Sequence, residues 1–199
     1  THSGTNTQTM GAIGQDINLF QYLHDGPYSG NNSSLSGHVD DIRIYDYVLD
    51  PQEVEYLYTS TVVHTDQSFY LSYDQSNVYE YHAGTTDVAA TGNGQYNQDP
   101  GSKIGTRSGQ YPQGTTWTVV PTWPGLTTAT ELTFSVWVFP TVLTGTHTLF
   151  ATEGFGSSST GIGAQLVNSG GNLQVRLLTR VSWTVRYRYV NITGISNYT

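Results

Sequence analysis

Apolar residues alternate with other residues in several segments, and this period of two constrains the fold of the chain most strongly. Side chains of a β-strand point alternately to opposite faces of a sheet, so the alternation predicts strands. Residues 132–139 are apolar on one face and half aromatic on the other, which predicts a central strand buried on both sides. Residues 173–177 and 183–189 carry Gln or Arg on their second face, which predicts strands with one solvated side.

The composition favours the same fold class. The chain has 22 Gly and 15 Tyr but a single Met among its 199 residues, a bias typical of all-β proteins. Residues 39–47 predict a further strand, with Ile42 and Ile44 on one face. Glycine-containing stretches at 144–146 and 169–172 separate apolar segments and predict hairpin turns. We therefore predict an all-β, antiparallel β-sandwich.

One segment, residues 50–58, has the pattern of a helix. Asp50 and Glu53 have the spacing of a capping box, and Pro51 suits the first helical position, where no N–H group is needed. The apolar residues able to share one side of this helix are Val54, Leu57 and Tyr58. We predict one short helix of about two turns.

The net charge is −8, so a nucleic-acid backbone or an anionic membrane surface would repel the chain. No stretch approaches the ~20 apolar residues of a membrane span. We expect neither a nucleic-acid partner nor a membrane span. Residues 1–60 carry a net charge of −7 and residues 61–199 one of −1, a difference that would aid their docking within or between chains.

The absence of cysteine excludes disulfides, thiolate zinc sites and cysteine nucleophiles. Several N-x-[ST] sequons are present, and such sequons mark surface loops of secreted proteins. The predicted glycosylation sites are Asn31, Asn32, Asn191 and Asn197. We therefore expect the protein to be extracellular or on the cell surface.

Residues 37–54 read GHVDDIRIYDYVLDPQEV and strongly resemble the closing signature of laminin G-like, concanavalin A-like jelly-roll domains. In that family a Gly, two Asp, an alternating strand ending in Tyr and a short helix normally end the domain. Here they lie near the start. Residues 69–74 (FYLSYD) resemble the opening strand of the family, and residues 132–138 (LTFSVWV) resemble its T-hydrophobic-S-x-W strand.

Joining Thr199 to Thr1 restores the order of the family. Residues 183–187 (WTVRY) resemble a later strand, and residues 12–14 (AIG) resemble the I-G strand that follows a hairpin at the junction. The resemblance then covers nearly the whole chain and implies a jelly-roll β-sandwich with one short helix.

The displaced order predicts how the domain is divided. Residues 1–60 are the C-terminal part of the sandwich, residues 66–199 are its N-terminal part, and residues 61–65 are a linker. The two parts can close within one chain, as in a circular permutant, or between copies in an array. We expect the array, a head-to-tail homopolymer, because the sequence begins and ends within the domain pattern.

The resemblance also implies a structural calcium ion. In resembling domains an Asp of the pair Asp40–Asp41 often helps to hold calcium, with oxygen ligands from the region of the opening strand, where Asp74 and Asp87 are the matching candidates. Calcium takes roughly six to eight oxygen ligands, which carbonyls and waters could complete. In the alternative, both Asp side chains bond only backbone amides or an Arg.

Catalysis is not expected. The E-x-D-x-x-E pattern of laminarinase-type glycoside hydrolases is absent, and Glu53 and Glu55 diverge on the predicted helix. The six His lack the H-x-x-x-H spacing of a zinc site. We therefore predict that the chain is not an enzyme.

Aromatic residues in or near the loop-rich region 84–128 suggest an alternative function, because lectin jelly rolls stack such side chains on sugars. The candidates for glycan binding are Trp117, Trp123, Tyr111 and Tyr96. In the competing interpretation, the two Trp residues cover the sandwich.

The arginines Arg176, Arg186 and Arg188 are predicted to share the outer faces of two neighbouring strands. They form either a solvated strip or a docking strip for the acidic residues 1–60 of another copy. Together, these features predict a non-catalytic extracellular structural or adhesive module that repeats in a filament or surface array. A carbohydrate-binding, lectin-like domain is the alternative.

Overall fold

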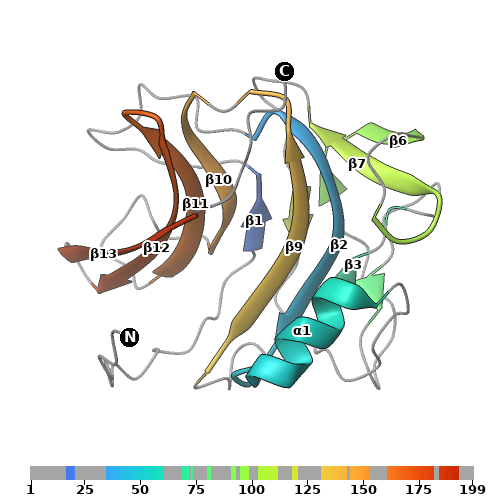
Figure 1. Cartoon of the computed structure of the whole chain (residues 1–199), viewed down its shortest axis with the longest axis horizontal. Coiled ribbons are helices and arrows are strands. Elements are labelled where there is room, and N and C mark those ends of the chain that lie inside the picture. The colour runs from blue at the N-terminus through green and yellow to red at the C-terminus, as the bar shows by residue number, and fades with distance from the viewer. Residues whose placement is uncertain are drawn as a thin grey trace.

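Two antiparallel β-sheets face each other and enclose the core, with one short helix beside them (Figure 1). The computed structural model describes residues 17–20, 35–60, 69–71, 73, 80–81, 91–92, 95–98, 103–111, 118–120, 131–142, 144–152, 161–181 and 184–192. The predicted all-β class, the sandwich and the short helix are confirmed. The jelly-roll connectivity stays a prediction.

Within the described residues, the first sheet has seven strands in the order β13-β12-β11-β10-β1-β8-β5. Their bounds are β1 (Ile17–Leu19), β5 (Thr91–Gly92), β8 (Thr118–Val120), β10 (Gly145–Thr152), β11 (Gly161–Ser169), β12 (Asn172–Val181) and β13 (Thr184–Asn191). The predicted hairpin at 169–172 joins β11 to β12. Gly170 and Gly171 both have positive φ, at 61° and 84°, which a two-residue hairpin turn of this kind requires and glycine supplies without strain.

The second sheet, as far as the structure describes the chain, has six strands, and β2 pairs with three of the others. Their bounds are β2 (Gly37–Tyr45), β3 (Phe69–Leu71), β4 (Glu80–Tyr81), β6 (Gln95–Gln98), β7 (Arg107–Tyr111) and β9 (Thr133–Pro140). Along one edge β2 pairs with β9, and on its other edge it pairs first with β7 and then with β3. Figure 1 shows β2 and β9 running side by side along the sheet.

The helix α1 (Pro51–Thr59) begins as the sequence predicts. The Glu53 N–H donates to the Asp50 carboxylate at 2.8 Å, and the Asp50 N–H donates to the Glu53 carboxylate at 2.7 Å. This capping box satisfies two N–H groups that the first turn leaves without helical partners. Among the described residues, no helix has the length and apolarity that crossing a membrane would require.

The apolar side predicted for α1 is buried at one residue only. Leu57 is buried, whereas Val54 is 52% exposed and Tyr58 is 67% exposed. The Tyr58 ring instead lies over Trp137 of β9, at the surface of the second sheet.

Both sheets contribute to one apolar core. The buried core residues are Ile17, Leu19, Phe20, Leu35, Val39, Ile42, Ile44, Phe69, Leu71, Tyr73, Tyr111, Leu149, Phe150, Ala164 and Leu166. The rings of Phe134 on β9 and Phe150 on β10 meet across the sandwich, with centroids 4.4 Å apart. Because Phe134 is partly buried and packs against the core, this contact joins the two sheets beside it.

Strands from the two ends of the sequence pair within the same chain. From residues 1–60, β1 pairs with β8 and β10, and β2 pairs with β3, β7 and β9. These partners all come from residues 66–199, so the described strands enclose their core without a second copy. The predicted linker 61–65 and the Thr199/Thr1 junction lie outside the described residues.

The strand β9 is less buried than its sequence predicts. Residues 133–138 are half-buried and Phe139 is exposed, so the expectation of a strand buried on both sides is wrong. In the part of the chain that the structure describes, β9 pairs with β2 alone. Gly37 permits this close pairing, because a Cβ at that position would lie 2.3 Å from the Phe139 carbonyl oxygen.

Candidate functional site

The predicted site residues Asp40 and Asp41 lie in the middle of β2, where its neighbour on one edge changes from β7 to β3. Against β9 the register shifts at this point. Asp40 is opposite Trp137 and Arg43 is opposite Ser135, so β2 contains one more residue than β9 over this stretch. The extra residue makes a β-bulge, a feature that bends a strand and redirects its side chains.

The sequence explains why the bulge is needed. Val39 and Ile42 both face the core, although they are three positions apart and strict alternation would send them to opposite faces. Asp41 adopts the irregular backbone of the bulge. Its φ is 52°, in the left-handed region that Asp tolerates better than most residues. The apolar alternation changes phase between Val39 and Ile42 in the sequence, and this change locates the bulge.

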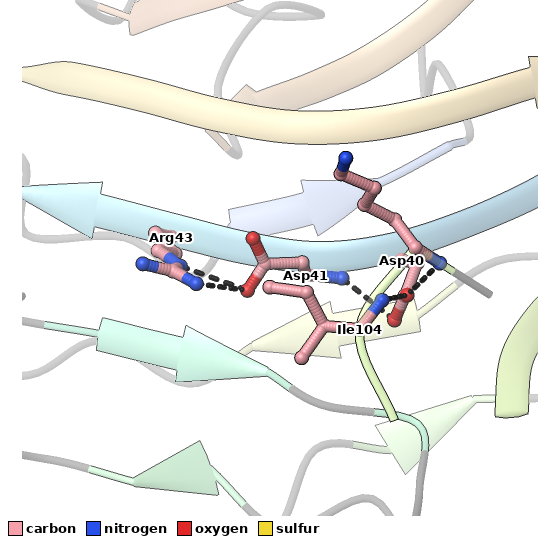
Figure 2. Close-up of polar contacts among 5 residues, drawn as sticks. Asp40, Asp41, Arg43 and Ile104 are labelled. Atoms are coloured by element: carbon pink, nitrogen blue, oxygen red, sulfur yellow. Dashed lines mark hydrogen bonds and ion pairs between the residues drawn. The ribbon is translucent and has the colours of Figure 1, made fainter. Parts of the chain in front are cut away.

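The Asp40 carboxylate fastens a loop to β2. It is 3% exposed, and one of its oxygens accepts the N–H groups of Lys103 and Ile104 at 2.6 and 2.9 Å. The other oxygen accepts the Asp41 N–H at 2.8 Å, as Figure 2 shows. Hydrogen bonds to an ionised acceptor are among the stronger ones in proteins. Asp40 therefore ties the loop that leads into β7 to the centre of the sheet.

Burial raises the pKa of Asp40 to about 6. The three backbone N–H donors act in the opposite direction, and the neighbouring charge of Asp41 adds to the increase. The loss of water around the charge is the dominant cause, because an ionised carboxylate is costly in a medium of low polarity. Asp40 therefore changes its charge near pH 6.

Asp41 forms a buried ion pair with Arg43, and both side chains are 1% exposed. One Asp41 oxygen accepts from the Nε and Nη2 atoms of Arg43, each at 2.8 Å. Burial raises the pKa of Asp41, and the hydrogen bond and charge of Arg43 lower it in part. The guanidinium also lies 5.5 Å from the centre of the Tyr70 ring on β3, so the pair connects β2 to its neighbour.

A second group of side chains, the Trp137 cluster, consists of Tyr58, Lys103 and Trp137. The rings of Tyr58 and Trp137 are stacked, with centroids 5.5 Å apart and planes inclined by 27°. The Lys103 ammonium lies 4.5 Å from the Trp137 ring centre and 5.9 Å from the Tyr58 ring centre. Cation–π attraction of this kind links the loop, the sheet and α1.

Sequence reasoning missed the Trp137 cluster. The aromatic second face of residues 132–139 was the only signal for Trp137, and it predicted burial under the sandwich. No sequence pattern indicated a role for Lys103, because its position depends on the hydrogen bond from its N–H group to Asp40. Contacts between segments so far apart in sequence depend on the tertiary fold.

The calcium site stays a prediction. Asp74 and Asp87 lie outside the described residues. The bonds of Asp40 and Asp41 match the alternative expectation, in which both side chains bond backbone amides or an Arg. A cation bound to Asp41 would lie beside the Arg43 guanidinium, which opposes calcium binding at that carboxylate. Among the described residues, no group of three or more potential metal ligands comes together.

The structure corrects one predicted glycan-binding residue. Tyr111 is 1% exposed, its ring packs on Phe20 at 4.4 Å, and its hydroxyl lies 2.9 Å from that of Tyr73. A ring inside the core cannot stack on a sugar, so this prediction is wrong. Tyr96 belongs to β6, and Trp117 and Trp123 lie outside the described residues.

Of the predicted glycosylation sites, Asn191 is described. It is the last residue of β13 and is exposed, and its Oδ1 atom accepts from Gln174 at 2.9 Å. The Nδ2 atom, which would carry a sugar, takes no part in that bond. Asn31, Asn32 and Asn197 lie outside the described residues.

The predicted arginine strip is divided between two faces. Arg176 is opposite Tyr189, and its guanidinium lies 5.2–5.3 Å from the ring centres of Tyr187 and Tyr189. Arg186 and Arg188 alternate with these tyrosines along β13 and therefore point to the opposite face. The expectation that all three arginines share an outer face is wrong, because the tyrosines of β13 occupy that face with Arg176.

No family model matches the chain, and no curated protein or solved structure matches it either. The resemblance to laminin G-like domains therefore rests on the residues alone. The function has to be argued from the geometry of the chain itself.

Replacement of Asp41 tests the buried ion pair. Asp41→Asn leaves the Arg43 charge buried without its carboxylate, and we expect the free energy of unfolding to fall by about 3–5 kcal/mol in urea denaturation. Adding Arg43→Met should recover most of the loss, because the uncompensated charge is then gone. A double variant no more stable than Asp41→Asn would contradict this account.

The pKa of Asp40 predicts how stability depends on pH. The folded pKa is about 6 and the ordinary value is 3.8, so between these values the folded chain holds a proton that the unfolded chain has released. Proton binding at Asp40 thus stabilises the folded chain. This stabilisation is fully present below about pH 4 and is lost as the pH rises through about 6, which lowers the free energy of unfolding by up to about 3 kcal/mol.

The measurement compares the wild-type chain with Asp40→Asn by urea denaturation across this pH range. Carboxyl groups other than the neighbouring Asp41 contribute equally to both proteins, so the difference between the two curves reports Asp40 together with its coupling to Asp41. We expect the wild type to gain stability over the variant on acidification from about pH 7 to about pH 4. A difference that does not change with pH would show that Asp40 has no raised pKa.

Proposed function

We propose that this chain is a non-catalytic structural or adhesive module that acts outside the cell as a repeating subunit of a filament or surface array. The observation that carries the proposal is the position of the exposed large apolar side chains. Those at α1 are Val48, Val54, Tyr56 and Tyr58, those on β12 and β13 are Leu177, Tyr189 and Val190, and Phe139 lies at the end of β9. Apolar side chains grouped at a surface mark sites of interaction with other molecules.

The two main groups lie on different sides of the molecule. In Figure 1, β12 and β13 form one end of the sandwich, and α1 lies beyond the other sheet. One copy can therefore contact two neighbours at once through different surfaces. Contacts of this kind extend into filaments when they do not close into a ring.

The roles of the polar residues in the resembling signature also support a structural module. Asp40 holds the loop at 103–104, and Asp41 neutralises the buried Arg43. Both carboxylates thus stabilise one arrangement of β2 with its neighbours. A fixed arrangement of strands suits a structural role.

We expect the purified chain to form species larger than its 21.8 kDa monomer, in amounts that rise with concentration. Sedimentation velocity measures this directly, and negative-stain images show whether the larger species are filaments. The amount of these larger species should rise because mass action favours association at higher concentration. A chain that stays monomeric up to about millimolar concentration would contradict the proposal.

Carbohydrate binding is the second candidate function, and the Trp137 cluster favours it. Phe139 is two residues beyond Trp137 on the same face of β9 and is 46% exposed. The exposed Tyr58 ring and Trp137 form an aromatic surface with the Lys103 ammonium at its side, and Phe139 lies farther along the same face of β9. Aromatic rings of this kind can stack on the apolar face of a sugar.

Tyr58→Ala tests this candidate on a glycan array. If the aromatic surface binds sugar, the variant should lose most of the signal, because it removes the most exposed ring of the cluster. Tyr56→Ala is the matched control, since Tyr56 is an exposed tyrosine on another side of the same helix. Equal signals from wild type and Tyr58→Ala, or equal losses in both variants, would count against a site at Trp137.

A further inference from the structure

We propose that the α1 patch of one copy docks on the β13 patch of a second copy. The α1 patch comprises Asp46, Val48, Val54, Glu55 and Tyr58. The β13 patch comprises Leu177, Arg186, Arg188 and Val190. This inference rests on the proposed function and names the interface that would join the repeating subunits.

The charges of the chain are strongly separated along the sequence. Residues 1–153 contain all fifteen acidic residues and three basic ones, whereas residues 154–199 contain four arginines and no acidic residue. The net charges of these parts are therefore −12 and +4. A surface built from β12 and β13 attracts a surface built from the acidic part, and this attraction both steers and orients association.

The β13 patch continues the core-facing side of the seven-stranded sheet beyond the core. Leu177 is opposite Ala164 of the core on one side and Arg188 on the other. Here, however, Leu177 is 47% exposed and Val190 is 58% exposed. Arg186 and Arg188 are exposed, and within the described residues neither has an ion-pair partner. The patch is thus apolar and basic, and open to solvent.

The α1 patch has the complementary character. Val54 and Tyr58 are one helical turn apart and both exposed, and Glu55 follows Val54 on the adjoining side. Asp46 and Val48, just before the helix, are exposed as well. Asp46 and Glu55 are outside the capping box, which is made by Asp50 and Glu53, so their charges are available to a partner.

A single copy cannot join its own patches. β13 is the terminal strand of one sheet, and α1 lies against the other sheet, on a different side of the molecule (Figure 1). The contact therefore joins two copies through different surfaces, and each copy keeps one patch of each kind for a further neighbour. Head-to-tail growth follows from this geometry.

The predicted sugar on Asn191 is compatible with this interface. Asn191 is opposite Gln174 in the register and shares its face with Arg176 and Tyr189. Arg186 and Arg188 lie on the other face. A glycan at Asn191 would thus extend away from the docked helix.

Charge reversal tests the interface in the full chain. We expect Arg186→Glu/Arg188→Glu and Asp46→Lys/Glu55→Lys each to raise the apparent dissociation constant of assembly by at least about tenfold, because like charges then face each other. An equimolar mixture of the two variants should assemble again, since each altered patch is complementary to the altered patch of the other variant. Sedimentation velocity gives all three results.

Two single variants provide the matched control. Arg188→Gln and Arg176→Gln each remove one positive charge from the same pair of strands, but from opposite faces. Only Arg188→Gln should weaken assembly if the β13 patch is the interface. Thermal denaturation checks that each variant is folded, and Arg188→Lys, which keeps the positive charge, should assemble as the wild type does.

The outcomes separate this inference from the proposed function. A wild-type chain that assembles, with charge-reversal variants that assemble equally well, would overturn the α1–β13 interface and leave the repeating module standing. Equal weakening by Arg188→Gln and Arg176→Gln would also overturn it, because general charge would then explain the effect. A wild-type chain that never assembles would overturn both.

Discussion

The bulge at Asp41 is the constraint on which the rest of the sandwich depends. β2 pairs with β9 on one edge and with β7 and β3 in turn on the other, so its register fixes three neighbours at once. Without the extra residue, one half of β2 would turn its apolar side chains to solvent, because a shift of one residue reverses the faces of a strand. The bulge therefore keeps Val39 and Ile42 in one core.

This arrangement buries two carboxylates and one guanidinium beside the core. Paired charges in such a place stabilise a fold little compared with apolar side chains of the same size, but breaking the pair costs much more. Asp40 lacks a cationic partner among the bonds described and uses three N–H donors instead, which leaves its pKa at about 6. Asp40, Asp41 and Arg43 thus contribute more to a unique register of β2 than to the net free energy of unfolding.

Local features of the structure could be predicted from the sequence, and features that depend on distant partners could not. The capping box of Asp50 and Glu53 and the hairpin at 169–172 involve neighbours in sequence, and both are present. The burial of Tyr111 and the stack of Tyr58 on Trp137 depend on which strands meet. On β13 the alternation of tyrosines and arginines is clear from the sequence. Which of them share a face with Arg176 depends on the register of β13 with β12.

The sequence of β13 also limits how copies can associate. β13 is the terminal strand of its sheet, and terminal strands invite pairing with a second copy. In an antiparallel pair of β13 strands centred on Tyr187, Arg186 of one copy would be opposite Arg188 of the other, and like charges directly opposite each other destabilise a sheet. The arginines thus oppose symmetric edge pairing while favouring an acidic partner on the face that carries them. With its described strands already paired within the chain, the proposed module would join other copies through its surfaces, and the alternation along β13 would favour a contact between unlike surfaces.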